Sequence, residues 1–271
     1  MVFLPIWLVL SHNIIIEQMP KKPNLETNNS NEMINFYKHN KMKEFLTEYH
    51  NPCFDSHQIK IPFRMAVIAS SGGGKTQWLL NLISRMSDTF GHIYVCYRTA
   101  EPLYLFLAKA IGEDKITFFT QLSKFPQINE MPKDKQILCI FDDVVNYSDK
   151  EQGIIKECYI RGRKHGKGIS MCYLSQSFFR IPKIIRLQCN YLILLKLGSK
   201  RDLALILADY GLGVDKNELM TIYKDATKIP FDFLKISTDE RQDSKRFSHN
   251  WTAYYDIGSD SDNDSIESSR K

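Results

Sequence analysis

A glycine-rich loop set between a strand and a helix is the feature that most constrains this chain. Residues 69–77 read ASSGGGKTQ. They follow the short apolar segment FRMAVI, which is typical of a buried strand, and precede QWLLNLISRM, in which apolar residues recur at helical spacing. Strand, glycine loop and helix in this order are the setting of a phosphate-binding loop, or P-loop. We therefore interpret the glycines as a phosphate cradle rather than as a flexible linker.

The chemistry of a cradle assigns roles to the residues of this loop. Glycines lack a Cβ, so backbone N–H groups can fold inward around phosphate oxygens. Lys75 stands at the helix entrance, from which its ammonium reaches the β- and γ-phosphates, and the hydroxyl of Thr76 is the expected Mg²⁺ ligand. The pattern G-x-x-x-x-G-K-[ST] departs only at its first position, which is Ala69. The expected nucleotide-binding residues are Ser70, Ser71, Gly72, Gly73, Gly74, Lys75, Thr76 and Gln77.

Apolar strands alternate with helices along most of the chain after residue 61. Runs such as HIYVCYR, ILCIFDDV, ISMCYLSQ and NYLILLKL are almost continuously apolar, which is typical of strands buried on both faces of a parallel sheet. Several of the segments between them carry apolar residues at helical spacing. The sequence therefore predicts an α/β fold, a mainly parallel sheet with helices on both faces and ligands at the carboxyl ends of its strands.

Three regions are expected along the 271 residues. Residues 1–60 read as a leader with one peripheral amphipathic helix around 33–49, and residues 20–60 within them are polar. Residues 61–238 form the P-loop domain. Residues 239–271 lose apolar periodicity and become rich in serine and aspartate, which predicts a disordered acidic tail.

Net charge and cysteine content indicate which partners and which cellular compartment suit the chain. The net charge is +5, and residues 256–271 contribute −3, so the preceding 255 residues carry +8. A basic body favours polyanionic partners, although a solvated surface of mixed charge is also compatible with this value. The six cysteines include no C-x-x-C pair and several lie in apolar runs. This pattern indicates reduced core residues in an intracellular, reducing compartment, and disulfides or zinc ligation are the alternative.

The apolar stretch at the amino terminus does not predict a membrane anchor. Residues 2–10, VFLPIWLVL, are too few to cross a bilayer. They also lack the basic start and the small-residue cleavage site of a signal peptide. Because a more ordinary polar start follows at Met19, we consider Met19 an alternative to Met1 as the initiation site, and we expect no stable membrane insertion.

Two acids end one of the predicted buried strands. Asp142 and Asp143 follow five apolar residues in ILCIFDD. In a parallel sheet they emerge beside the cradle, where Asp142 can hold Mg²⁺ through hydration water and Asp143 can act as general base on an attacking water. Aspartate is also common at strand ends without any function. The cradle is what favours the catalytic interpretation.

A glutamine ends the next predicted strand. Gln176 lies in SQS, residues 175–177, and a parallel sheet brings it level with the two acids. A neutral amide in this place can contact both the γ-phosphate and the attacking water, although a polar strand-end residue without a role is the alternative. The order of cradle, acids and glutamine is the order that a motor ATPase needs.

A basic turn, RGRKHGKG, occupies residues 161–168 between the acids and the glutamine. Its side chains suit phosphate contact, either with a DNA backbone or with the nucleotide of a neighbouring subunit. A guanidinium supplied by an adjacent subunit stabilises the charge that develops on the transferring phosphoryl group. Arg163 is the candidate arginine finger, with Arg161 and Arg180 behind it, and a merely solvated turn is the alternative.

Together these segments resemble the genome-packaging ATPases of poxviruses and other large DNA viruses, virophages and polinton-like elements, within the FtsK/HerA class of P-loop motors. The likeness runs from about residue 62 to residue 197. It rests on PFRMAVIASSGGGKT, ILCIFDDV, RGRKHGKGIS and YLSQSFFRIPKIIR. The acid-to-glutamine spacing and the basic turn are more specific than the cradle.

The resemblance implies a RecA-like (ASCE) ATPase core, a homo-oligomeric ring, and translocation of double-stranded DNA into a capsid driven by hydrolysis of ATP with Mg²⁺. By motif position, Lys75 and Thr76 would hold phosphate and metal, and Asp142 would hold metal. Asp143 would act on the water, Gln176 would be the sensor and Arg163 the trans finger. Capsid portal or vertex proteins would be further partners, and the host cytoplasm or the virion the location.

Other proteins with the same cradle remain as alternatives. A small-molecule kinase is expected to carry an arginine-bearing lid and an acceptor site, and the acid pair followed by a strand-end glutamine argues against it. A GTPase would need the tetrapeptide N-K-x-D, which does not occur. A helicase or another FtsK/HerA-type DNA pump shares the core. A non-catalytic DNA-binding scaffold would keep the nucleotide as a structural ligand.

Overall fold

The computed structural model of the chain describes residues 35–38 and 40–257. The described residues fall into two units, divided between residues 47 and 48.

The described part of the first unit forms short 3₁₀ turns instead of the amphipathic helix expected around 33–49. η1 spans Phe36–Lys38 and η2 spans Asn40–Phe45. A backbone bond from Lys38 N to Asn35 O (3.1 Å) is typical of these turns, and the Asn35 side chain also accepts the N–H two residues on. The aromatic side chains Phe36, Tyr37 and Phe45 of these turns are exposed, so their packing does not extend the turns into a helix. The helix prediction was wrong here.

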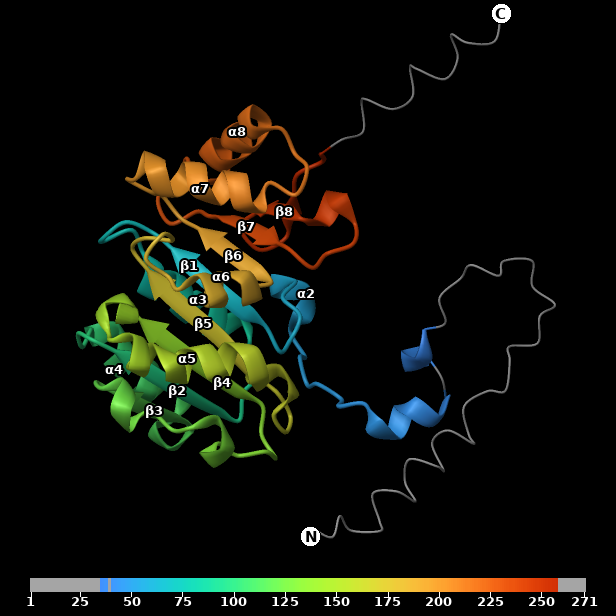
Figure 1. Cartoon of the computed structure of the whole chain (residues 1–271), viewed down its shortest axis with the longest axis vertical. Helices are drawn as coiled ribbons and strands as arrows, with labels where there is room; N and C mark the ends of the chain where they lie inside the picture. Colours follow the sequence, from blue (N-terminus) through green and yellow to red (C-terminus); the bar gives the residue numbers. More distant parts are fainter. Residues whose placement is uncertain (1–34, 39, 258–271) are drawn as a thin grey trace, which may run out of the picture. The chain divides into compact units, whose positions relative to one another are not determined.

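Within residues 48–257, one nine-stranded sheet forms the frame, in the order β3-β2-β4-β5-β1-β6-β7-β8-β9 (Figure 1). The strands from β3 to β6 are parallel and the last three are antiparallel. This confirms the predicted α/β fold with a mainly parallel sheet. The strands are β1 Arg64–Ile68, β2 His92–Tyr97, β3 Ile116–Phe119, β4 Ile137–Asp142, β5 Ile169–Ser175, β6 Tyr191–Leu194, β7 Leu234–Ser237, β8 Phe247–His249 and β9 Ala253–Tyr254.

Two helices rather than one connect β6 to β7, and they reverse the direction of the last strands. A single crossover helix carries the chain back to the opposite end of the strands, so that the next strand runs parallel to the last. The two helices α7 (Lys200–Tyr210) and α8 (Lys216–Ala226) instead return the chain to the same end of the strands at which β6 finished. β7 therefore starts beside the end of β6, where Leu194 pairs with Leu234.

Helices cover both faces of the sheet, as the continuous apolar strands predict. Along β1, Met65 and Val67 point into one buried cluster, while Ala66 and Ile68 point into the other. The first cluster is closed by α3 and α4, and the second by α5 to α8. The helices not yet given are α2 Phe54–His57, α3 Lys75–Arg85, α4 Pro102–Ile111, α5 Asp149–Arg161 and α6 Lys183–Gln188.

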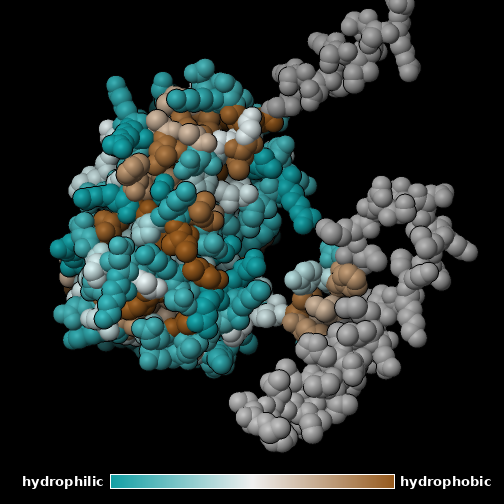
Figure 2. All heavy atoms as spheres, in the orientation of Figure 1, coloured by the Kyte–Doolittle hydropathy of each residue, from teal (hydrophilic) through white to brown (hydrophobic). Residues whose placement is uncertain are grey.

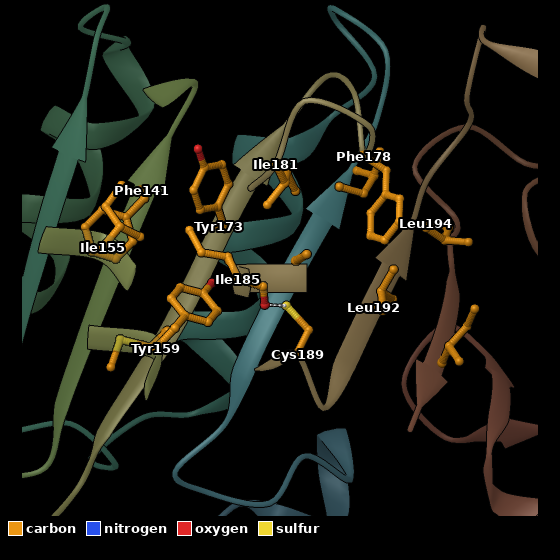
Figure 3. Close-up of a cluster of buried hydrophobic side chains, with 14 of the residues drawn as sticks. Phe141, Ile155, Tyr159, Tyr173, Phe178, Ile181, Ile185, Cys189, Leu192 and Leu194 are labelled. Atoms are coloured by element: carbon orange, nitrogen blue, oxygen red, sulfur yellow. Dashed lines mark hydrogen bonds between the residues drawn. The ribbon is translucent and has the colours of Figure 1, made fainter. Parts of the chain in front are cut away.

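Buried side chains pack α5 and α6 against the sheet, and this packing also fixes the loops at the ends of the two helices. Figure 3 shows Tyr159 of α5 and Ile185 of α6 in the cluster that also holds Phe141 and Tyr173 of the sheet, all of them fully buried. The Tyr159 hydroxyl donates to Met65 O (2.7 Å), so its polar atom is satisfied. On the face that Figure 2 shows, hydrophobic residues appear in patches among hydrophilic ones.

The domain extends past residue 238, contrary to expectation. β8 and β9 continue the sheet, and Phe247 in β8 is fully buried. Trp251 stacks on Trp78 of α3 with ring centroids 5.6 Å apart. Strands of three and two residues carry no periodic pattern, so the sequence predicts a tail where the structure has an edge of the sheet. The rest of the predicted tail, beyond residue 257, lies outside the described residues.

The domain also begins before residue 61. α2 ends at His57, and both His57 and Ile59 are fully buried. Lys235 Nζ donates to His57 O (3.2 Å), which ties this entry segment to β7.

The cysteines agree with a reduced core. All six are free, and every one except Cys53 is buried. Of the helices within the described residues, none is long and apolar enough to cross a membrane. The apolar stretch 2–10 and Met19 lie outside the described residues, so the expectations about them stay predictions.

Acid should destabilise the domain through His57. Burial, together with the nearby cations Lys235 and Arg85, lowers the pKa of this imidazole to about 4. The unfolded chain takes up the proton near pH 6.5, whereas the folded chain does not until about pH 4. The free energy of unfolding therefore falls as the pH drops through this window, by about 1.4 kcal/mol per pH unit from this group.

The variant His57→Asn should flatten that fall. Asparagine does not titrate, and its Oδ1 can accept the Ile59 N–H that His57 Nδ1 now accepts (3.0 Å). Urea unfolding at pH 7 and pH 5 measures the effect as the difference between wild type and variant. Equal losses in the two proteins would show that His57 does not set the acid sensitivity.

Candidate active site

The carboxyl edge of the parallel strands gathers the glycine loop, the acids and the glutamine. β4, β5 and β1 are neighbours, and the register pairs Asp142 with Leu174 and Ile68 with Ser175. The residues that follow these strands therefore leave the sheet together. Since neighbouring strands lie about 5 Å apart, the loop after β1 and the acids after β4 are separated by about 10 Å, with the end of β5 between them.

The loop backbone has the geometry that a cradle demands. Gly72 and Gly74 have φ values of +70° and +89°, in the left-handed region that favours glycine. Gly73 N donates to Ser70 O (2.9 Å), and a Cβ on Gly73 would lie only 2.9 Å from the same oxygen. Around the Cβ position of Gly72 nothing lies within 4 Å. The loop therefore has no room for a side chain at Gly73, whereas the space around Gly72 is open.

Ala69 fits the loop because its backbone continues the sheet. Its N–H donates to Ser175 O (3.2 Å), and it is not among the residues with positive φ. Glycine is therefore not required at this position. The Ser70 hydroxyl accepts the Gly198 N–H (2.7 Å), so this side chain ties the loop to the segment after β6.

Lys75 and Thr76 are the first two residues of α3, and each is only 8% exposed. Gly74 is the N-cap residue. The unpaired N–H groups and the positive dipole end of a helix favour an anion at this place. Ser71 and Gln77 are exposed beside the loop.

Asp142 is a buried carboxylate at the end of β4. It is 6% exposed, and the Tyr104 hydroxyl donates to its Oδ2 (2.7 Å). Burial raises the pKa of Asp142 to about 6, and the bond from Tyr104 opposes that rise. Sequence reasoning missed Tyr104, because its helix reads as ordinary core and only the fold brings it to the acid.

Asp143 and Gln176 are in direct contact. Gln176 Nε2 donates to Asp143 Oδ2 (2.9 Å). Asp143 has a φ of +51°, a conformation that aspartate and asparagine tolerate better than most residues. The sequence places these two side chains level with one another, and the structure brings them together.

Two arginines share a cavity of about 320 Å³ with this pair. Arg98 follows β2 and Arg180 follows β5, and both line the cavity with Asp143 and Gln176. Sequence reasoning held Arg180 only in reserve behind Arg163 and missed Arg98. The signal for Arg98 was its position directly after the apolar run HIYVCY, at the end of a strand.

Arg163 lies away from the cradle of its own chain. It is exposed in η7 (Gly162–Lys164), between α5 and the amino end of β5. β5 has seven residues and spans about 23 Å, which separates Arg163 from the edge that holds the site. Arg163 can therefore serve only a site in another molecule.

The family model described as "Poxvirus A32 protein" matches residues 53–229. No curated protein sequence matches the chain.

Solved structures offer a distant likeness. The genome packaging NTPase B204 of Sulfolobus turreted icosahedral virus 2, in complex with ATP-gammaS, is 12% identical, with 71% of this chain and 98% of that chain covered and a TM-score of 0.49. EssC of Geobacillus thermodenitrificans (ATPases 2 and 3) is 12% identical, with 74% and 41% covered and a TM-score of 0.48. The conjugation coupling protein TcpA of pCW3 is 13% identical, with 72% and 61% covered and a TM-score of 0.44.

Proposed function

Because this chain belongs to the Poxvirus A32 protein family, we propose that it is an ATP-hydrolysing motor that moves double-stranded viral DNA into a capsid. The observation that carries the proposal is the meeting of three elements at one edge of a parallel sheet. These are the glycine cradle, the acid pair and the strand-end glutamine. Ligands of open α/β sheets bind at this edge.

The residues present fit a triphosphate with Mg²⁺. The cradle is open on its outer side, and Lys75 and Thr76 are held in the first turn of α3. Within the described residues no cluster of three or more His, Cys, Asp or Glu side chains forms a metal cage. Mg²⁺ is usually held by few protein oxygens together with phosphates and waters. Thr76 and Asp142 would supply those oxygens, and the bound ion would neutralise charge on the phosphates.

The chain's own side chains can carry the hydrolysis. Asp143 takes the proton of the attacking water as general base, and Gln176 orients that water beside the γ-phosphate. Their present hydrogen bond means that both face the same small volume. Arg98 and Arg180, in the same cavity, stabilise charge on the transferring phosphoryl group.

The motor works as a ring of identical subunits on DNA. Arg163, which cannot reach its own cradle, acts as the arginine finger on the nucleotide of a neighbouring subunit. The basic body suits the phosphates of double-stranded DNA. Capsid portal or vertex proteins are further partners, and the host cytoplasm or the virion is the site of action.

ATP turnover by the purified chain, with and without linear double-stranded DNA, tests this function. We expect DNA to raise turnover and Lys75→Ala to abolish it. Turnover indifferent to DNA would favour a small-molecule kinase. Stable DNA binding without turnover would favour a nucleotide-dependent scaffold.

The basic turn should contribute to the salt dependence of DNA binding. If Arg161 and Lys164, both exposed in the turn, each neutralise one DNA phosphate, exchanging both for glutamine should make the slope of log K against log salt concentration shallower by about 1.8. The matched control exchanges Lys216 and Lys224, two exposed lysines of α8, for glutamine. A slope equal to that of wild type would remove the turn from the DNA interface.

A further inference from the structure

We propose that Phe231 is the platform on which the base of the bound nucleoside triphosphate stacks. This inference rests on the proposed function, because it extends the same site from the phosphates to the base. Phe231 is an exposed aromatic residue that has no role in the proposed hydrolysis.

Phe231 occupies a turn position that disfavours bulky residues. Asp232 N donates to Ile229 O (3.2 Å), Pro230 is the second residue of this turn, and Phe231, the third, has a φ of +72°. Proline second and positive φ third are typical of a type II turn, in which the third residue is usually glycine or asparagine. The side chain is also 62% exposed, so burial recovers little of the strain. Such strained positions concentrate at functional sites.

Hydrogen bonds from the end of β8 hold the turn in this conformation. The Asp232 carboxylate bonds to His249 Nε2 (2.8 Å) and accepts from Asn250 Nδ2 (3.0 Å). Phe233 N donates to Asn250 Oδ1 (3.1 Å), and Asn250 N donates to Phe233 O (2.9 Å). These hydrogen bonds hold in one conformation the turn that carries the exposed Phe231 ring.

The ring lies against the glycine cradle. A Cβ built on Gly74 would come within 2.5 Å of Phe231 Cδ1 and 3.6 Å of Leu195 Cδ2. Gly74 is the last residue of the loop and caps α3, whose first turn holds Lys75. Phe231 thus borders the place where the phosphates bind.

Phe231 also lies on the side of the cradle opposite to the catalytic groups. In the sheet, β5 and β4, which lead to Gln176 and Asp143, are on one side of β1, while β6 and β7 are on the other. Phe231 belongs to the segment that enters β7. A triphosphate whose γ-phosphate points to Asp143 consequently directs its base toward β6 and β7.

An exposed aromatic ring at that end suits a nucleobase. Stacking uses the π-face that every base has, and it does not read the hydrogen-bonding edge. The ligand class is therefore a nucleoside triphosphate, with ATP as the natural probe. Inorganic tripolyphosphate offers the same phosphates without the base.

Calorimetric titration of the full-length chain with ATP and with inorganic tripolyphosphate, both in excess Mg²⁺, separates the two parts of the site. Phe231→Ala should weaken ATP binding about tenfold or more and leave tripolyphosphate binding within about twofold of wild type. Phe231→Trp, which keeps an aromatic face, should retain most of the ATP affinity. Phe231→Gly, which relieves the positive φ, supplies a second variant without a ring should the alanine variant fold poorly.

Three results would overturn the inference. Equal weakening of both ligands would mean that the ring only supports the loop. Unchanged ATP binding by the alanine and glycine variants would mean that the base does not touch it, while the proposed function would stand. Wild-type protein that binds neither ligand would remove the proposed function and the stacking platform with it.

Discussion

Replacing Asp143 with asparagine should lower DNA-stimulated ATP turnover by about 10²–10⁴-fold, the usual contribution of a general base. The substitution removes the ability to take a proton and little else. Asparagine tolerates the φ of +51° at this position, and its Oδ1 can still accept the bond that Gln176 Nε2 now donates to the carboxylate. ATP binding should therefore remain close to that of wild type.

Turnover and nucleotide affinity have to be measured side by side to read this result. Lys75→Ala is the matched comparison, because it should lose binding and turnover together. Turnover of Asp143→Asn within a few-fold of wild type would assign the base to another group. Loss of ATP binding in the same variant would indicate damage to the site rather than to the chemistry.

The sequence predicts the centre of the sheet well because its strands are buried on both faces. β4 and β5 are buried along their whole length, and their continuous apolar runs are what that burial requires. β8 and β9 could not be predicted in this way. Their place depends on the stacking of Trp251 on Trp78 and on pairing with β7, contacts between residues far apart in the chain.

The same distinction divides the candidate site. The cradle, the acids and Gln176 each sit at the end of a strand, so their meeting follows from the predicted topology. Tyr104 reaches Asp142 from a helix 38 residues earlier in the chain, and nothing in the local pattern distinguishes it from a core residue. The position of Phe231 depends on a turn whose third residue carries no glycine to reveal it.

The amphipathic helix predicted around 33–49 shows the limit of periodicity. Apolar residues at helical spacing predict a helix only where a partner surface receives them. Phe36, Tyr37 and Phe45 are exposed in the structure, and the described part of the segment forms short 3₁₀ turns followed by irregular chain. Spacing alone cannot supply the packing energy that a helix of this length needs.

Asp142→Asn should abolish turnover and at the same time stabilise the metal-free protein. The pKa of Asp142 is about 6 in the folded chain against 3.8 for an ordinary aspartate, because burial disfavours its charged form. Between these two values the folded chain holds the proton more firmly than the unfolded chain, so rising pH costs stability. Above about pH 6 the full cost is present, on the order of 2–3 kcal/mol, and asparagine removes it.

Urea unfolding in EDTA at pH 7.5 and pH 4 tests this trade of stability for function. The gain of Asp142→Asn over wild type should be present at pH 7.5 and should fade toward pH 4, because the folded carboxyl is then protonated and the unfolded one, with its pKa of 3.8, begins to take up the proton as well. Asp143→Asn, at a less buried carboxylate, is the control and should change stability little. A loss of stability of the same size at both pH values would mean that the hydrogen bond from Tyr104 outweighs the cost of burying the charge. The expected gain would instead show that the charged Asp142 side chain lowers the stability of the metal-free fold. Such a cost is expected of a buried carboxylate whose role is to bind Mg²⁺.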